Sequence, residues 1–165
     1  ASSSFSDYRL VIAGAPNIER EIYDKYIPSG ISCTVEYGQT YKIIESSSAA
    51  LVTSGTATLE TALLGTPQVV CYNTDFRHLL HLLKKVVLSV RYVSLVNLIC
   101  GREAVRELIA SDMTVENVKK ELGAILPGGS KRDEIMNSYE ELRQILGPSG
   151  ASDRAAKEIF YKFKV

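Results

Sequence analysis

The stretch that decides the fold reads Ala49-Ala-Leu-Val-Thr53-Ser54-Gly55-Thr56-Ala57-Thr-Leu-Glu60, an apolar run that passes through a glycine turn into a helical pattern. In such a turn, backbone N–H groups and the positive end of a helix dipole face an anion. The hydroxyls of Ser54 and Thr56 can cap the helix, and Gly55 permits a positive φ and close approach of a ligand. The motif therefore predicts a phosphate site, and an ordinary helix start is its alternative interpretation.

The carboxylate of Glu60 comes one and a half helical turns after this glycine. At that distance it can accept hydrogen bonds from the ribose hydroxyls of a ligand whose phosphates lie at the helix N-terminus. A solvated surface carboxylate is the alternative. Together, the glycine turn and Glu60 predict a nucleotide as the ligand.

Short apolar runs alternate with helical patterns on both sides of this stretch. Strands are expected at Arg9–Ala13, Ile31–Glu36, Ala49–Thr53, Gln68–Tyr72 and Tyr92–Leu95. Helices are expected between them, at Ile18–Tyr26, Gly38–Ser46, Ala57–Leu64 and Phe76–Leu88, and afterwards alone, at Arg102–Ala110, Val115–Leu126, Ser130–Leu146 and Asp153–Phe163. This order predicts an α/β fold, a Rossmann-like parallel sheet with helices on both faces, followed by an all-helical C-terminal segment.

The expected organisation has three parts. Residues 1–7 are interpreted as a tag or flexible lead-in, and residues 8–127 as a Rossmann-like domain that is incomplete at its N-terminus. Residues 128–165 are interpreted as C-terminal helices, which could pack on this domain, on a missing N-terminal domain, or on a second chain in a homodimer.

Composition gives expectations about nucleic acid, redox compartment and membrane spans. Nineteen basic residues balance nineteen acidic ones, so no net charge recruits nucleic acid. The three cysteines, Cys33, Cys71 and Cys100, lie in apolar stretches, as buried thiols of a reducing compartment do. No apolar stretch has the ~18 residues of a spanning helix. These features predict a cytoplasmic protein.

A second group of polar residues follows the expected strand at Tyr92–Leu95. It consists of Ser94, Asn97, Arg102 and Glu103. Polar groups after a strand end converge on pockets in parallel sheets. Asn97 could equally be a turn residue, and Arg102 with Glu103 could be the first turn of a helix.

The segment 76–88 is apolar on all sides and also carries basic residues. A contact with acyl chains or a membrane surface is one interpretation, through Phe76, Leu79, Leu80 and Leu83. A helix pressed between the sheet and a neighbour is the other. His78 and His81 are the only histidines, and the local sequence does not supply the further ligands that a metal site needs. No metal and no cofactor are expected.

Two motifs together resemble lipid-A-disaccharide synthases. They are Ser-Gly-Thr-Ala-Thr-Leu-Glu at 54–60 and Tyr-Val-Ser-Leu-Val-Asn-Leu, followed by Gly-Arg-Glu, at 92–103. Gly65-Thr66-Pro67 lies between them, and Ala151-Ser-Asp-Arg-Ala-Ala156 is similar to the closing helix of that family. The resemblance extends over about residues 9–156 and corresponds to the C-terminal half of a GT-B glycosyltransferase.

The resemblance implies a function for the parent protein. That protein would transfer diacylglucosamine from UDP-2,3-diacylglucosamine to 2,3-diacylglucosamine 1-phosphate, forming lipid A disaccharide and releasing UDP, with inversion and without a metal. Ser54, Gly55, Thr56 and Ala57 would line the diphosphate, Glu60 would hold the ribose, and Asn97 with Arg102 would complete the donor site.

The resemblance also implies what this chain does not carry. The acceptor contacts and the general base belong to the N-terminal domain of the family, so no catalytic residue is expected here and the chain alone should be inactive. The implied location is the cytoplasm, with a peripheral contact on the inner face of the inner membrane. The alternatives are another UDP-sugar glycosyltransferase or epimerase of the GT-B fold, and a non-catalytic nucleotide-binding or assembly module.

Overall fold

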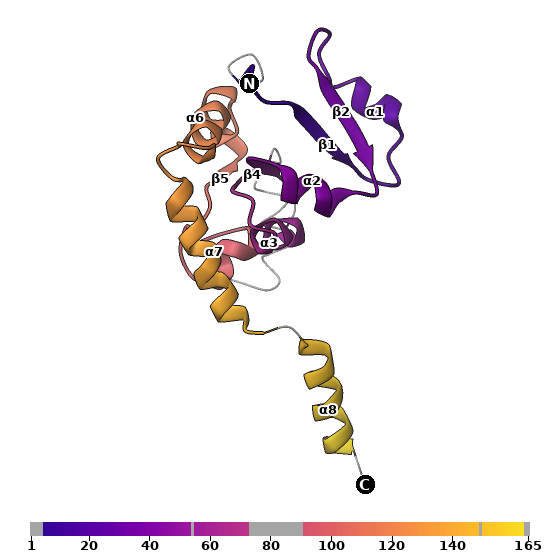
Figure 1. The fold of residues 1–165 in the computed structure, drawn as a ribbon, viewed down its shortest axis with the longest axis vertical. Coiled ribbons are helices and arrows are strands. Elements are labelled where there is room, and N and C mark those ends of the chain that lie inside the picture. Colours follow the sequence, from indigo (N-terminus) through magenta and orange to yellow (C-terminus); the bar gives the residue numbers. More distant parts are fainter. Residues whose placement is uncertain (1–4, 54, 73–90, 149, 164–165) are drawn as a thin grey trace.

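A computed structural model gives the fold of residues 5–53, 55–72, 91–148 and 150–163. Figure 1 shows parallel strands with helices around them and one helix, α8, that extends away from the rest. The architecture is α/β with Rossmann-like parallel pairing, as the alternation of apolar runs and helical patterns predicts. The strands, however, form two small sheets instead of one.

The first sheet contains β1 (Leu10–Gly14) and β2 (Cys33–Tyr37), which pair in parallel from Leu10 with Cys33 to Gly14 with Tyr37. Between them lies the short helix α1 (Arg20–Asp24). Gly14 has no room for a side chain, because a Cβ there would lie 2.6 Å from the ring of Tyr37. Glycine thus lets the Tyr37 ring lie directly against the backbone at the carboxyl end of the pair.

The second sheet has the order β3-β4-β5, also parallel. Its strands are β3 (Ala50–Val52), β4 (Gln68–Tyr72) and β5 (Glu107–Ile109). Helix α2 (Thr40–Ser46) precedes β3, and α3 (Gly55–Leu63) connects β3 to β4. The central strand β4 is buried along Gln68–Cys71, as the continuous apolar sequence of a doubly paired parallel strand predicts.

The remaining elements follow β4. They are α5 (Leu95–Cys100), the 3₁₀ turn η2 (Ala110–Asp112), α6 (Val115–Ile125), α7 (Arg132–Leu146) and α8 (Ala151–Phe163). Thr114 caps α6, since its hydroxyl accepts a hydrogen bond from the backbone N–H of Asn117. The last two helices, α7 and α8, are close to the positions that the sequence predicts for them. No described helix is long and apolar enough to cross a bilayer.

Two predicted elements are wrong. Residues 92–95 are not a strand, because Ser94 caps a helix that begins at Leu95. Residues 102–110 are not a helix, because their last part pairs with β4 as β5. The predicted helix at 76–88 lies outside the described residues.

The hydrophobic core lies between the second sheet and helices α3, α5, α6 and α7. Its largest fully buried side chain is Tyr139 of α7. The Tyr139 hydroxyl donates to the carbonyl of Thr66 at 3.2 Å and accepts from Gln68 Nε2 at 3.1 Å. Burial raises the pKa of Tyr139 above its ordinary value, so the phenol remains neutral. Tyr139 therefore fixes α7 to the start of β4.

Candidate functional site

The glycine turn lies where the sequence places it, between the end of β3 at Val52 and the start of α3 at Gly55. This is the carboxyl edge of the sheet, where ligands of open parallel sheets bind. Gly55 and Ala57 are half-buried and Thr56 is exposed. Ser54 lies outside the described residues.

Gly55 is not among the described glycines with positive φ, so the turn does not use the left-handed conformation that glycine permits. A Cβ at Gly55 would meet no atom within 4 Å. The backbone above this position is thus open to close approach, the other property for which glycine is expected here.

Two threonines of α3 bond back to its own backbone. The Thr58 hydroxyl donates to the Gly55 carbonyl at 2.6 Å, and the Thr61 hydroxyl donates to the Ala57 carbonyl at 2.7 Å. Both side chains are buried. Both hydroxyls donate to carbonyl groups, so they do not occupy the N–H groups of the first turn. Those N–H groups have no acceptors within a helix and can therefore donate to an anion.

Glu60 is half-buried and accepts a hydrogen bond from the Tyr41 hydroxyl at 3.1 Å through Oε1. The hydrogen bond raises the pKa of Tyr41. Tyr41 lies in the first turn of α2, so this bond connects α2 with α3. The sequence does not reveal this partner, because the two residues are 19 positions apart on different helices.

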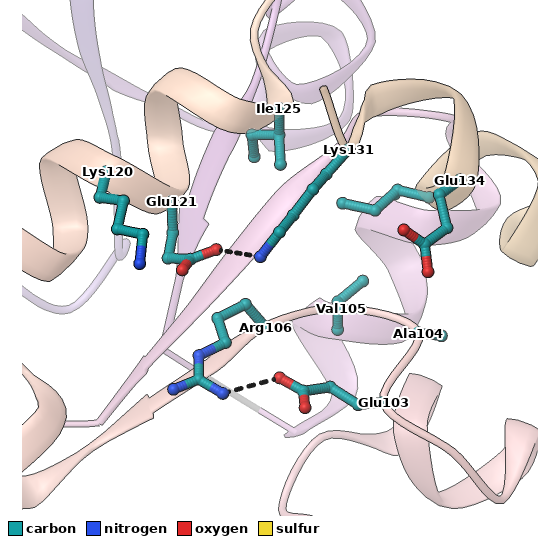
Figure 2. Close-up of a pocket in the computed structure, with 10 residues that line it drawn as sticks. Glu103, Ala104, Val105, Arg106, Lys120, Glu121, Ile125, Lys131 and Glu134 are labelled. Atoms are coloured by element: carbon teal, nitrogen blue, oxygen red, sulfur yellow. Dashed lines mark hydrogen bonds and ion pairs between the residues drawn. The ribbon is translucent and has the colours of Figure 1, made fainter. Parts of the chain in front are cut away.

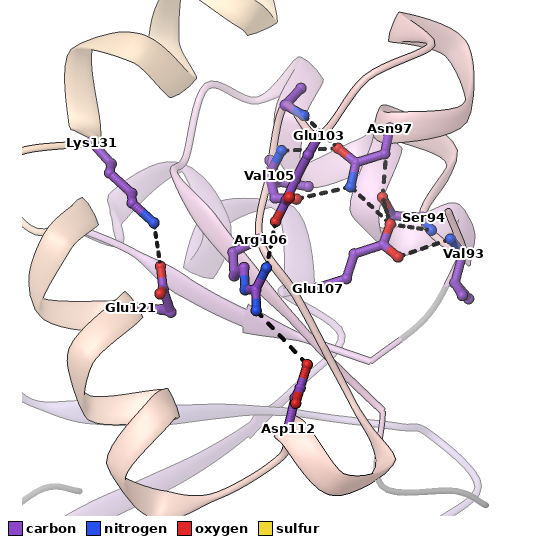
Figure 3. A network of polar contacts seen from close by, with 11 residues as sticks. Val93, Ser94, Asn97, Glu103, Val105, Arg106, Glu107, Asp112, Glu121 and Lys131 are labelled. Carbon is purple, nitrogen blue, oxygen red and sulfur yellow. Dashed lines mark hydrogen bonds and ion pairs between the residues drawn. The ribbon is translucent and has the colours of Figure 1, made fainter. Parts of the chain in front are cut away.

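Asn97 is fully buried on α5, and its amide makes four hydrogen bonds within the protein (Figure 3). Oδ1 accepts from the backbone N–H groups of Ala104 at 2.8 Å and Val105 at 2.9 Å. Nδ2 donates to the Val105 carbonyl at 2.8 Å and to Glu107 Oε1 at 2.8 Å. Asn97 therefore holds the loop that leads into β5.

Glu107, the first residue of β5, was not predicted and is the centre of the same network (Figure 3). Its carboxylate accepts from the backbone N–H groups of Val93 and Ser94, each at 2.9 Å, and from the Ser94 hydroxyl at 2.7 Å. A carboxylate thus occupies the N-terminus of α5, where anions are stabilised. The spacing of Ser94 and Asn97, typical of a cap, is the signal that could have located this helix start.

Arg102 follows α5 and points toward α7. Its guanidinium forms an ion pair with Glu141 and donates to the Ser138 hydroxyl at 3.2 Å. The hydrogen bond to Glu141 raises the pKa of Arg102. Helix α5 packs on α3, yet no described hydrogen bond joins Asn97 or Arg102 to Gly55–Glu60. Their part in donor binding stays a prediction.

A cavity of about 440 Å³ lies between the loop before β5 and helices α6 and α7 (Figure 2). Two ion pairs lie in its lining, one from Lys131 to Glu121 at 2.7 Å and one from Arg106 to Glu103 at 3.0 Å. Because its lining includes the residues that precede β5, the cavity lies toward the amino edge of the sheet. It is separate from the glycine turn at the carboxyl edge.

Two further predictions concern the acyl contact and the metal. The acyl or membrane contact at Phe76, Leu79, Leu80 and Leu83 lies outside the described residues. Among the residues that the structure does describe, no group of three or more His, Cys, Asp or Glu side chains could hold a metal ion.

Comparison with known proteins identifies relatives along almost the whole chain. The family model described as lipid-A-disaccharide synthetase matches residues 1–160. The lipid-A-disaccharide synthase of Myxococcus xanthus is 35% identical over 152 residues, which cover 92% of this chain and 39% of the relative. That of Syntrophus aciditrophicus is 41% identical over 119 residues, which cover 72% and 30%. The chain thus spans well under half the length of these relatives.

Proposed function

Because the chain belongs to the lipid-A-disaccharide synthetase family, we propose that it forms the donor-binding part of such an enzyme and holds UDP-2,3-diacylglucosamine. The parent enzyme would transfer diacylglucosamine to 2,3-diacylglucosamine 1-phosphate and release UDP. The proposal includes a cytoplasmic location and an acceptor bound by a part of the protein outside these residues.

The glycine turn at the carboxyl end of β3 carries the proposal. The open backbone at Gly55 and the N-terminus of α3 would receive the diphosphate, with Thr56 and Ala57 in the same first turn. As the acceptor oxygen bonds to the anomeric carbon, the bond from that carbon to the phosphate oxygen breaks and UDP leaves with the electron pair. Backbone N–H groups and the helix dipole stabilise this growing negative charge. The proton of the acceptor goes to a base outside this chain.

Glu60 would hold the ribose in this arrangement. Tyr41 binds one of its two carboxylate oxygens and fixes the orientation of the side chain. A carboxylate has about four lone-pair positions, so Glu60 can accept ribose hydroxyls while the Tyr41 bond remains. In the same proposal, Asn97 positions α5 and the loop before β5, and Arg102 contributes charge once it leaves Glu141.

UDP is expected to raise the melting temperature of this chain and of the full-length protein. At ten times its Kd, a ligand that binds only the native state adds about 1.4 kcal/mol, or about 3–6 °C for a domain of this size. Glu60→Ala should weaken UDP binding about tenfold and remove most of the shift at the same UDP concentration. The measurement is a thermal melt followed by circular dichroism.

The matched control is Glu116→Ala, which removes a carboxylate from the first turn of α6. It should leave the UDP-dependent shift unchanged. If millimolar UDP produces no shift in the full-length protein, or if Glu60→Ala and Glu116→Ala behave alike, the donor site is not at the glycine turn.

A further inference from the structure

The cavity between the loop before β5 and helices α6 and α7 belongs to no part of the proposed donor site. Its volume of about 440 Å³ is typical of sites for small molecules. The buried apolar side chains of Val105, Ile125 and Ile135 form its floor, whereas its charged residues are mostly exposed at the rim. The cavity thus combines an apolar surface with polar groups that can orient a ligand.

Charges of both signs line the cavity in equal number. Three of the lining residues are basic and three are acidic: Arg106, Lys120 and Lys131, and Glu103, Glu121 and Glu134. A ligand with only a negative charge would meet three carboxylates, and a ligand with only a positive charge would meet three cations. Because like charges repel at short range, this lining favours a ligand that carries one charge of each sign.

Glu121 on α6 is the only charged residue among the buried residues that the structure describes. Its side chain is 9% exposed, and its carboxylate accepts a hydrogen bond from Lys131 Nζ at 2.7 Å. A buried ion pair returns little net stability, so this pair is not explained by stability alone. An ammonium group has three donors, and Glu121 takes one of them. The pair therefore holds Lys131 Nζ in the cavity lining with donors left for a ligand.

Arg106 supplies a second donor that lacks a partner. Its Nη1 donates to Glu103 Oε1 at 3.0 Å, but its Nε is buried and has no acceptor. Buried donors without acceptors are rare in folded proteins. Because Nε is covered, the side chain must turn toward the cavity before this N–H reaches an acceptor. A carboxylate bound beside Arg106 would supply that acceptor.

The rim also carries two charges without an ion-pair partner among the described residues. They are Lys120 on α6 and Glu134 on α7, and both are exposed. Figure 2 shows Lys120 on one side of the cavity, next to Glu121, and Glu134 on the other. The cationic groups thus lie toward one side and a free carboxylate lies on the other, as the two ends of a zwitterion require.

We propose that the cavity binds a small zwitterion of the ω-amino acid type, in which an apolar chain separates a carboxylate from an ammonium group. The carboxylate accepts hydrogen bonds from Lys131 Nζ and Arg106 Nε, with Lys120 close by. The ammonium group donates to Glu134, and the methylene chain lies on the apolar floor. The site does not depend on which ligand the glycine turn binds.

Calorimetric titration of the full-length protein with 6-aminohexanoate tests the proposal. We expect saturable binding in the millimolar range. Hexanoate lacks the ammonium group and hexylamine lacks the carboxylate, so each should bind at least about tenfold more weakly. Saturating UDP should leave the affinity unchanged, because the cavity lies toward the amino edge of the sheet and the glycine turn at the carboxyl edge. Absence of saturable binding, equal binding of either analogue, or displacement by UDP would overturn the proposal.

Variants at the exposed rim give an independent readout. Glu134→Gln should weaken binding of 6-aminohexanoate about tenfold and leave that of hexanoate unchanged, because only the ammonium group contacts Glu134. Lys120→Gln should weaken both ligands alike, by about threefold, as expected for an exposed charge. The matched controls are Asp133→Asn on α7 and Lys119→Gln on α6, next to these residues but outside the lining. If Glu134→Gln and Asp133→Asn bind 6-aminohexanoate equally, the ammonium group does not lie at Glu134 and the proposal is wrong.

Discussion

Replacing Asn97 with alanine is expected to lower the free energy of unfolding by about 3–5 kcal/mol, one of the two largest losses that a single substitution should cause in this chain. The substitution removes four hydrogen bonds. It takes from Val105 the side-chain partner of both its N–H and its carbonyl, and it leaves the Ala104 N–H with only its bond to the Arg102 carbonyl at 3.0 Å. A buried polar group that loses its partner costs about 1–3 kcal/mol. The Asn97 amide supplies two donor bonds and two acceptor bonds at this one position, which a methyl group cannot replace.

Urea denaturation followed by circular dichroism measures this loss, since the chain contains no tryptophan. Asn137→Ala is the matched control, because Asn137 is exposed on α7 and its replacement should change stability by less than about 0.5 kcal/mol. Asn97→Asp provides a second check. It keeps an acceptor for the two N–H groups but replaces the donor with a charge beside Glu107, so it should also destabilise. A loss below about 1 kcal/mol for Asn97→Ala would show that the loop before β5 is held by other contacts.

Tyr139→Ala is expected to destabilise by about 3–5 kcal/mol, through lost burial and a cavity in the core. The ring is fully buried and packs among α3, α5 and the second sheet. Its hydroxyl also makes hydrogen bonds with Thr66 and Gln68. Tyr139→Phe should therefore lower the free energy of unfolding by about 1–2 kcal/mol by itself. The difference between the two variants separates packing from hydrogen bonding.

Tyr161→Ala is the matched control for this pair, because Tyr161 is 73% exposed on α8. It should change the free energy of unfolding by less than about 0.5 kcal/mol. If Tyr139→Ala and Tyr161→Ala shift the urea midpoint equally, α7 does not pack on the sheet as described.

The sequence predicts the first four strands well because their signals are local. Apolar runs bounded by glycine or proline mark β4 at Gln68–Tyr72 and the turn from β3 into α3. The region after residue 91 is different. Residues 107–109 become a strand only because β4 offers them an edge, with Val70 opposite Glu107. No local pattern specifies a pairing between segments 37 positions apart, and the helical spacing of residues 102–110 therefore predicts the wrong element.

The candidate site also contains a part that local sequence predicts and a part that depends on how separate elements pack. Gly55, Thr56 and Ala57 were located correctly at a strand end, since strand, turn and helix are adjacent in sequence. The bond from Tyr41 to Glu60 and the network around Glu107 depend on how separate helices pack, which composition and spacing do not encode. The motif at 92–103 predicts a role for Asn97 in donor binding, and the structure shows that its amide makes hydrogen bonds within the protein.

The attachment of α7 to the sheet has a consequence for the order of folding. Its contacts with Gln68, Thr66, Leu63 and Ser48 join residues 71 to 84 positions apart. Contacts of such long range form late, because a long loop must close before they can stabilise anything. During synthesis on the ribosome, the core around β3 and β4 therefore cannot form completely until residue 143 has emerged. Until then their apolar faces remain exposed to chaperones and to other nascent chains.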